Sequence, residues 1–243
     1  MKRINILGGG PAGLSAALAA LRQGTRDIGV RVIEKSRLPR HKVCGEFFSP
    51  EIGPELERLG AWNAFLTAGP ARVRRTVLHF GAKQKSSRLP EPAYGLSRYT
   101  FDLMLLDLAR AAGAEVVNEA GDEPPVIVAT GRHSMLNQKG RRQKGQRLFG
   151  FKAHFEGPTD DAVELFFFER SYVGVTSIEA GRTNVCGLAP ESFLSRFGFE
   201  YDEIVTKCPA LSARLGPLRR VTQWFSTGPL QYGQNFEHLA KDT

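Results

Sequence analysis

The chain has 243 residues, 42% of them hydrophobic and 24% charged, and a formal net charge of +8. This composition is typical of a globular protein with a substantial core. No apolar run approaches the ~20 residues that a transmembrane helix needs, and the glycines at positions 8–10 interrupt the first apolar run too early for a secretory signal peptide. We therefore expect a cytoplasmic protein without a transmembrane segment.

The three cysteines, Cys44, Cys186 and Cys208, are widely separated, and none belongs to a C-x-x-C pair. This number and spacing indicate neither a zinc site nor a disulfide framework. We expect reduced thiols, as in a reducing compartment, and no bound metal.

The first motif is a glycine-rich turn between a strand and a helix. Residues 4–7 form a short apolar strand, and Gly8, Gly10 and Gly13 then complete a G-x-G-x-x-G pattern. In such a turn the first glycine permits the sharp bend, the second lets the main chain approach a pyrophosphate, and the third lets the helix pack against the strand. The helix expected over residues 12–22 would offer free N–H groups and the positive end of its dipole to phosphate.

An acidic residue stands at the end of the next apolar strand, which we expect over residues 30–33. Glu34 follows Gly13 by about 20 positions, the spacing of the acid that binds ribose hydroxyls. The pattern favours FAD or NAD over NADP at this turn. The alternative is a glycine-rich turn that holds no ligand.

Residues 36–50 contain two prolines and a glycine and predict a loop. A loop that follows the ribose-binding acid would run along the flavin side of the cofactor. Either Arg40 or Lys42 could neutralise phosphate there, and the Cys44-Gly45 pair could bring main chain close to the isoalloxazine ring. A buried, inert thiol is the alternative interpretation of Cys44.

The middle of the chain predicts a helix around residues 55–65, a hairpin over residues 71–97 and a second long helix. Thr100 or Asp102 is a plausible first residue of that helix, and Gly113 is suited to end it.

A buried strand is expected next, ending in Ala-Thr-Gly within residues 126–134. Residues 162–188 then predict alternating strands, with turns near 169–172 and 180–182. Four apolar side chains of these strands could line a substrate pocket or belong to ordinary sheet core: Phe166, Phe168, Tyr172 and Val175.

Basic residues concentrate in residues 132–147. An anionic partner, such as nucleic acid or a membrane surface, is one interpretation; a solvated linker is the other. No aromatic residues alternate with these charges as a stacking platform for single strands requires, so we expect no nucleic-acid partner.

Several segments resemble one protein family. The segment "PRHKVCGEFFSPE", together with the N-terminal "GGGPAG", resembles geranylgeranyl-reductase-like FAD-dependent oxidoreductases, part of the wider superfamily of aromatic hydroxylases and flavin-dependent halogenases. "SRYTFDLMLLDLARAAGAEVV" and "VIVATGRHS" are similar to later segments of that family.

The resemblance implies FAD as cofactor, an apolar, lipid-like, polyketide-like or aromatic small-molecule substrate, and an external electron donor such as NAD(P)H. It implies monooxygenase or double-bond reductase activity, and no catalytic residue is assigned. The cofactor-binding residues predicted from pattern and resemblance together are Gly8, Gly10, Pro11, Ala12, Gly13, Glu34, Lys35, Lys42, Cys44, Gly45, Arg98, Thr130 and Gly131.

The resemblance also implies an α/β fold with a discontinuous Rossmann-like FAD domain, having a parallel sheet and three layers, and a smaller β-rich substrate domain. We expect the FAD domain at residues 1–70 and 98–150, the substrate domain at 71–97 and 151–230, and an atypical tail at 231–243. The family has a G-D-A-x-G segment after its S-T-G-P-L sequence, and this chain contains none. The alternative function is therefore a truncated or split flavoprotein that binds dinucleotide weakly or with a partner chain completing the FAD site.

Overall fold

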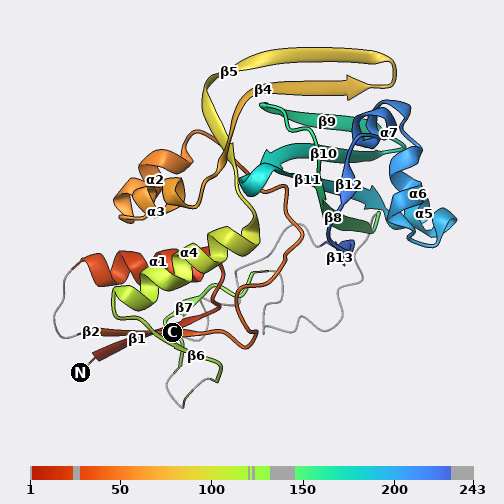
Figure 1. The fold of residues 1–243 in the computed structure, drawn as a ribbon. Helices are drawn as coiled ribbons and strands as arrows, with labels where there is room; N and C mark the ends of the chain where they lie inside the picture. The colour runs from red at the N-terminus through yellow and green to blue at the C-terminus, as the bar shows by residue number, and fades with distance from the viewer. Residues whose placement is uncertain (1, 24–27, 120, 122–123, 132–145, 231–243) are drawn as a thin grey trace.

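The computed structural model describes residues 2–23, 28–119, 121, 124–131 and 146–230. Two β-sheets organise this part of the chain, and the chain passes back and forth between them (Figure 1). Most of the basic stretch at 132–147 and the predicted tail at 231–243 lie outside the described residues.

Sheet A is small and fully parallel, with strand order β6-β2-β1-β7. Its strands are β1 (Lys2–Leu7), β2 (Ile28–Ile33), β6 (Glu115–Val117) and β7 (Ile127–Val128). Isoleucine and valine, which favour buried parallel strands, dominate them. Helices α1 (Pro11–Arg22) and α4 (Arg98–Ala111) lie side by side over the sheet (Figure 1), and their leucines fill the first hydrophobic core.

Two short helices replace the single helix predicted around residues 55–65. They are α2 (Ile52–Arg58) and α3 (Trp62–Thr67). Gly60 separates them with φ +65°, while its N–H bonds to the Glu57 carbonyl and the next N–H, of Ala61, bonds to the Leu56 carbonyl. This pair of bonds is a Schellman motif, which ends a helix.

Helix α4 begins earlier than predicted. Ser97 is its N-cap: the backbone of Ser97 is extended, and its hydroxyl oxygen accepts a hydrogen bond from the Thr100 N–H at 3.1 Å. Thr100 and Asp102, the predicted starts, lie within the first two turns. Gly113 follows the helix end with φ +101°, as its predicted role requires.

Sheet B is large and mixed, with strand order β12-β8-β11-β10-β9-β4-β5-β3 and β13 paired to β8. The pairing of β4 with β9 is parallel, and the other pairings are antiparallel. Its strands are β3 (Phe47–Phe48), β4 (Ala71–Phe80), β5 (Lys83–Gly95), β8 (Leu148–Glu156), β9 (Ala162–Phe168), β10 (Ser171–Ile178), β11 (Arg182–Pro190), β12 (Arg219–Arg220) and β13 (Phe225–Thr227). Strands β4 and β5 form the hairpin expected over 71–97.

One face of sheet B packs against the short helices that follow β11. These are α5 (Glu191–Leu194), α6 (Tyr201–Thr206) and α7 (Pro209–Leu215), with a 3-10 turn at Ser195–Phe197 after α5. A further 3-10 turn, Glu179–Gly181, connects β10 to β11. Phe166 and Val175 are buried in this second core and Phe168 packs against it, whereas Tyr172 is 40% exposed. Sheet core is therefore the better description of Phe166, Phe168 and Val175.

The two sheets meet where the end of β5 crosses β10. A Cβ atom on Gly95 would lie 1.8 Å from the Ser177 carbonyl oxygen, so the crossing requires glycine. Ser97, two residues later, caps α4, and the crossing therefore places the N-terminus of α4 beside sheet B. No helix in the described residues is long and apolar enough to span a membrane.

Candidate functional site

The glycine turn after β1 is held by close main-chain contacts. Gly8 has φ +111°, and a Cβ there would lie 2.4 Å from the Ala129 carbonyl oxygen. A Cβ on Gly13 would lie 1.8 Å from the Gly8 carbonyl oxygen. Both glycines are therefore required by the turn itself, whether or not a ligand is bound.

Gly10 differs from the other two glycines. It is the N-cap of α1, with φ −81°, and the atom nearest to a Cβ built on it is the Lys42 Nζ at 3.9 Å. The α1 N-terminus has no side-chain cap, and Pro11 occupies its first turn beside Ala12. Gly10 therefore combines open space beside its main chain with a helix N-terminus that no side chain caps. An anion site requires both.

Glu34 directs its carboxylate back at the glycine turn. One oxygen accepts a hydrogen bond from the Gly9 N–H at 2.9 Å, and the other accepts from the Ser36 N–H at 2.8 Å. These bonds fix the carboxylate beside the turn, and each oxygen keeps a lone pair for a further donor. Lys35, by contrast, is exposed at the surface.

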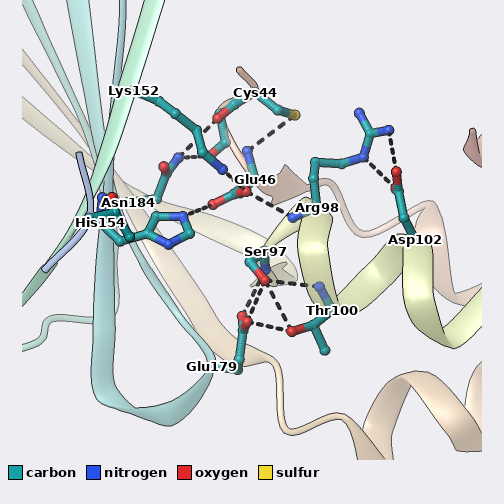
Figure 2. A network of polar contacts seen from close by, with 12 residues as sticks. Cys44, Glu46, Ser97, Arg98, Thr100, Asp102, Lys152, His154, Glu179 and Asn184 are labelled. Atoms are coloured by element: carbon teal, nitrogen blue, oxygen red, sulfur yellow. Dashed lines mark hydrogen bonds and ion pairs between the residues drawn. The ribbon is translucent and has the colours of Figure 1, made fainter. Parts of the chain in front are cut away.

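Lys42 and Arg98 converge on one buried carboxylate. Asp102, fully buried, binds Arg98 Nε at 2.7 Å (Figure 2). Asp102 also binds Lys42 Nζ, at 2.7 Å. Burial is the largest influence on Arg98 and lowers its pKa, but the hydrogen bond and charge of Asp102 outweigh it and hold the pKa above its ordinary value. Two cations against one carboxylate leave a positive charge close to Gly10.

The main chain of Cys44 and Gly45 lies between the two sheets. The Asn184 side-chain amide, on β11, donates to both carbonyl oxygens, at 3.1 Å and 2.9 Å (Figure 2). Cys44 Sγ accepts a hydrogen bond from the Glu46 N–H at 3.4 Å. The three cysteines are all free thiols.

Glu46 is buried and joins three segments of the chain. Its carboxylate accepts hydrogen bonds from the Arg98 N–H at 2.8 Å and from Lys152 Nζ, and it lies 2.6 Å from His154 Nε2. Burial is the largest influence and raises the pKa of Glu46, but the hydrogen bond to His154 and the charge of Lys152 together bring the pKa below its ordinary value. The carboxylate is therefore held in its charged form.

Sequence reasoning did not find this network. The signal was present in β8, where Lys152 and His154 alternate with Phe151, Ala153 and Phe155. Such alternation predicts a strand with one polar, solvated face. Here the polar face is covered, and both polar side chains are buried.

Thr130 and Gly131 follow β7 at the carboxyl edge of sheet A. The Ala129 N–H bonds to the Leu7 carbonyl at 2.7 Å, and the Thr130 nitrogen would lie 3.0 Å from a Cβ on Gly8. The structure therefore brings this turn against the glycine turn. Most of the predicted site residues gather here, whereas the side chain of Lys35 is exposed at the surface.

An apolar groove of about 930 Å³ begins at the same turn. It runs along α1 from Pro11 and Ala12, with α2 opposite and Phe48 and Phe101 between them. In the described part of the chain, no cluster of three or more histidine, cysteine or acidic side chains could hold a metal ion.

Parts of the chain are similar in sequence to known proteins. Residues 3–88 match the family model described as Tryptophan halogenase. The chain is 46% identical over 55 residues to a menaquinone reductase of Mycolicibacterium smegmatis, and 30% identical over 119 residues to a tryptophan 2-halogenase of Chondromyces crocatus. These matches cover 23% and 47% of this chain, and 13% and 22% of the two relatives.

The fold is also that of solved flavoproteins. The myxobacterial chondrochloren halogenase CndH, described as a variant of FAD-dependent halogenases, has a TM-score of 0.73 at 18% identity. The likeness covers 93% of this chain and 64% of CndH, so the chain spans less than two thirds of that protein's length.

Over the matched residues the chain is similar to halogenases, its fold is that of FAD-dependent flavoproteins, and the comparisons support FAD as its cofactor. The predicted α/β fold class and the predicted cofactor are thereby confirmed. The narrower resemblance to geranylgeranyl reductases is not confirmed.

Proposed function

We propose that this chain binds FAD at the glycine turn after β1 and acts as a flavoprotein oxidoreductase, either a monooxygenase or a double-bond reductase. The observation that carries the proposal is the convergence on Gly10 of an uncapped helix N-terminus, the Glu34 carboxylate and the Lys42 ammonium group. FAD supplies the redox chemistry when it is bound.

Each group has a separate task in binding. The α1 N-terminus and Lys42 would hold the pyrophosphate, because both present positive charge at the open side of Gly10. Glu34 would accept hydrogen bonds from ribose hydroxyls. Arg98, fixed by Asp102, and the Cys44-Gly45 main chain would lie toward the flavin half.

An apolar small-molecule substrate is supported by a row of aromatic side chains on sheet B. Phe80, Phe167 and Tyr172 lie on the face opposite to α6 and α7, with ring centroids 4.8 Å and 6.2 Å apart in succession. Phe80 is 51% and Tyr172 40% exposed, so this face has apolar area for a ligand. We expect the electrons to come from an external donor such as NAD(P)H, because the sequence holds no second G-x-G-x-x-G turn.

The test is a titration of the purified chain with FAD, followed by absorbance and flavin fluorescence. We expect a bound flavin spectrum, and at least tenfold weaker binding by Glu34→Gln, which keeps the shape of the side chain but removes its charge. Glu203→Gln, an exposed site on α6, is the matched control. Failure of the chain to bind FAD, or an unchanged affinity in Glu34→Gln, would refute the proposed nucleotide site.

One observation favours the alternative function, binding of FAD only with a partner chain. The groove along α1 leaves apolar surface uncovered next to the glycine turn, and such surfaces commonly mark interaction sites. If the chain alone stays colourless with excess FAD and gains a flavin spectrum when a second polypeptide is present, the alternative replaces the first proposal.

A further inference from the structure

The segment Cys44–Glu46 is bound from both sides of the domain junction. From sheet B, Asn184 reaches two successive carbonyl oxygens, and Lys152 and His154 reach the Glu46 carboxylate. From α4, the Arg98 N–H binds the same carboxylate. Two peptide planes and one side chain are therefore held by residues that are 52 to 140 positions away in sequence.

The buried side chain of Asn184 contributes hydrogen bonds to the main chain of Cys44 and Gly45, which an apolar side chain of similar size could not make. It is 1% exposed, and its Oδ1 has no hydrogen-bond partner among the described residues, whereas its Nδ2 has two. A buried amide that leaves its acceptor unsatisfied has an energetic cost that an apolar residue would avoid. Its observed contribution is the donation to Cys44 and Gly45.

The backbone conformation of Glu46 is unfavourable for a residue with a side chain. Its φ of +53° lies in the left-handed region, which glycine adopts more easily. A glycine here would relieve the backbone but would leave Lys152 buried without its carboxylate. The carboxylate contacts, and not the turn, therefore explain why a side chain stands at this position.

We propose that Glu46 and Asn184 are positioning residues, which hold the main chain of Cys44 and Gly45 in the conformation that receives the flavin half of FAD. This inference rests on the proposed function. Two contacts connect the Cys44–Glu46 segment to the proposed FAD site. Lys42, two residues before Cys44, lies beside Gly10. The Arg98 N–H binds Glu46, and the Arg98 side chain binds Asp102, which also binds Lys42.

The test uses Asn184→Leu, which removes the donor at similar volume. Thr183→Val is the matched control, because Thr183 is the adjacent residue of β11, is fully buried, and has a hydroxyl without a partner among the described residues. A second variant, Glu46→Gln with Lys152→Met, removes both charges of this buried ion pair together, so that Lys152 does not leave an unpaired buried charge.

Three quantities are measured on each folded variant: the FAD dissociation constant, the absorption spectrum of bound flavin, and the rate at which Ellman's reagent labels Cys44 without FAD. A Cys44→Ser variant gives the labelling background from the other two thiols. We expect at least tenfold weaker FAD binding, a shifted flavin spectrum and at least fivefold faster labelling for Asn184→Leu, and wild-type values for Thr183→Val.

The outcomes separate this proposal from the one on which it rests. Absence of FAD binding by the wild-type chain would refute the proposed function and this inference with it. Wild-type FAD affinity and spectrum in a folded Asn184→Leu protein would refute the inference alone, whatever the labelling rate. If Asn184→Leu does not fold, the charge-balanced double variant decides by the same criteria.

Discussion

Replacing Gly13 and Gly10 by alanine should affect different properties of the protein. At Gly13 the added Cβ would lie 1.8 Å from the Gly8 carbonyl oxygen, where ordinary contacts begin at 3.4 Å. The carbonyl oxygen belongs to the main chain and the position of a Cβ is fixed by its own backbone, so no side-chain rotation relieves the overlap, and the turn or α1 must shift. We expect Gly13→Ala to lower the free energy of unfolding by about 3 kcal/mol, the upper part of the range for overpacked interiors.

Gly10→Ala is the matched comparison at the same turn. Its Cβ would meet nothing closer than Lys42 Nζ at 3.9 Å, and its φ of −81° suits alanine. Loss of a favourable N-cap residue costs up to about 1 kcal/mol, and the reduced freedom of the unfolded chain offsets about 0.4–1 kcal/mol. Stability should therefore stay near wild type, while the methyl group occupies the space that a pyrophosphate would use.

The assay pairs urea unfolding without FAD with FAD titration of the folded proteins. For Gly10→Ala we expect loss of about 2 kcal/mol of binding free energy, or about 30-fold in affinity, because at least one charge-assisted hydrogen bond to phosphate is lost. Equal destabilisation by both substitutions, or wild-type FAD affinity in Gly10→Ala, would contradict the distinct roles given to the two glycines.

Three further outcomes are expected. Ser97→Ala should destabilise the chain by about 1–2 kcal/mol, seen as a Tm several degrees lower, because the N-cap bond to Thr100 is lost; an unchanged Tm would contradict this role. The pKa of Glu46 lies below its ordinary 4.5 in the folded state. The charged carboxylate should therefore stabilise the fold above pH 4.5, and this contribution should be lost as the pH falls through the folded-state pKa. The unfolding curves of wild type and Glu46→Gln should approach each other in acid. Burial raises the pKa of Cys186 to about 12, so Ellman's reagent should leave Cys186 unlabelled in the folded protein at pH 8, and labelling there at the rate of the unfolded chain would contradict the raised pKa.

The turn and its acid could be predicted because they depend on local spacing. Gly8, Gly10 and Gly13 act within one strand-turn-helix unit, and Glu34 follows on the neighbouring strand of the same sheet. The sequence pattern does not predict that Gly60 divides the helix expected around residues 55–65 into α2 and α3, although a glycine within a helical pattern weakens a helix assignment.

The Glu46 network could not be predicted from the sequence in this way. Its partners lie 52 to 108 positions away, on α4 and β8, and they meet only because the end of β5 crosses β10 at Gly95. In an alternating strand the polar residues are expected to face solvent. The loop that covers Lys152 and His154 is distant in sequence, so the strand pattern gives no sign of it.

The two long helices over sheet A begin in opposite electrostatic conditions. At α4 the protein supplies its own anions: Glu179 accepts from the Ser97 N–H at 2.7 Å and Glu46 accepts from the Arg98 N–H at 2.8 Å. At α1 no side chain caps the first turn, and the nearest charged group at Gly10 is the Lys42 ammonium. Carboxylates at the start of α4 would repel a phosphate, whereas the uncapped start of α1 and the Lys42 ammonium group would attract one, so the two helix ends are not equivalent as anion sites.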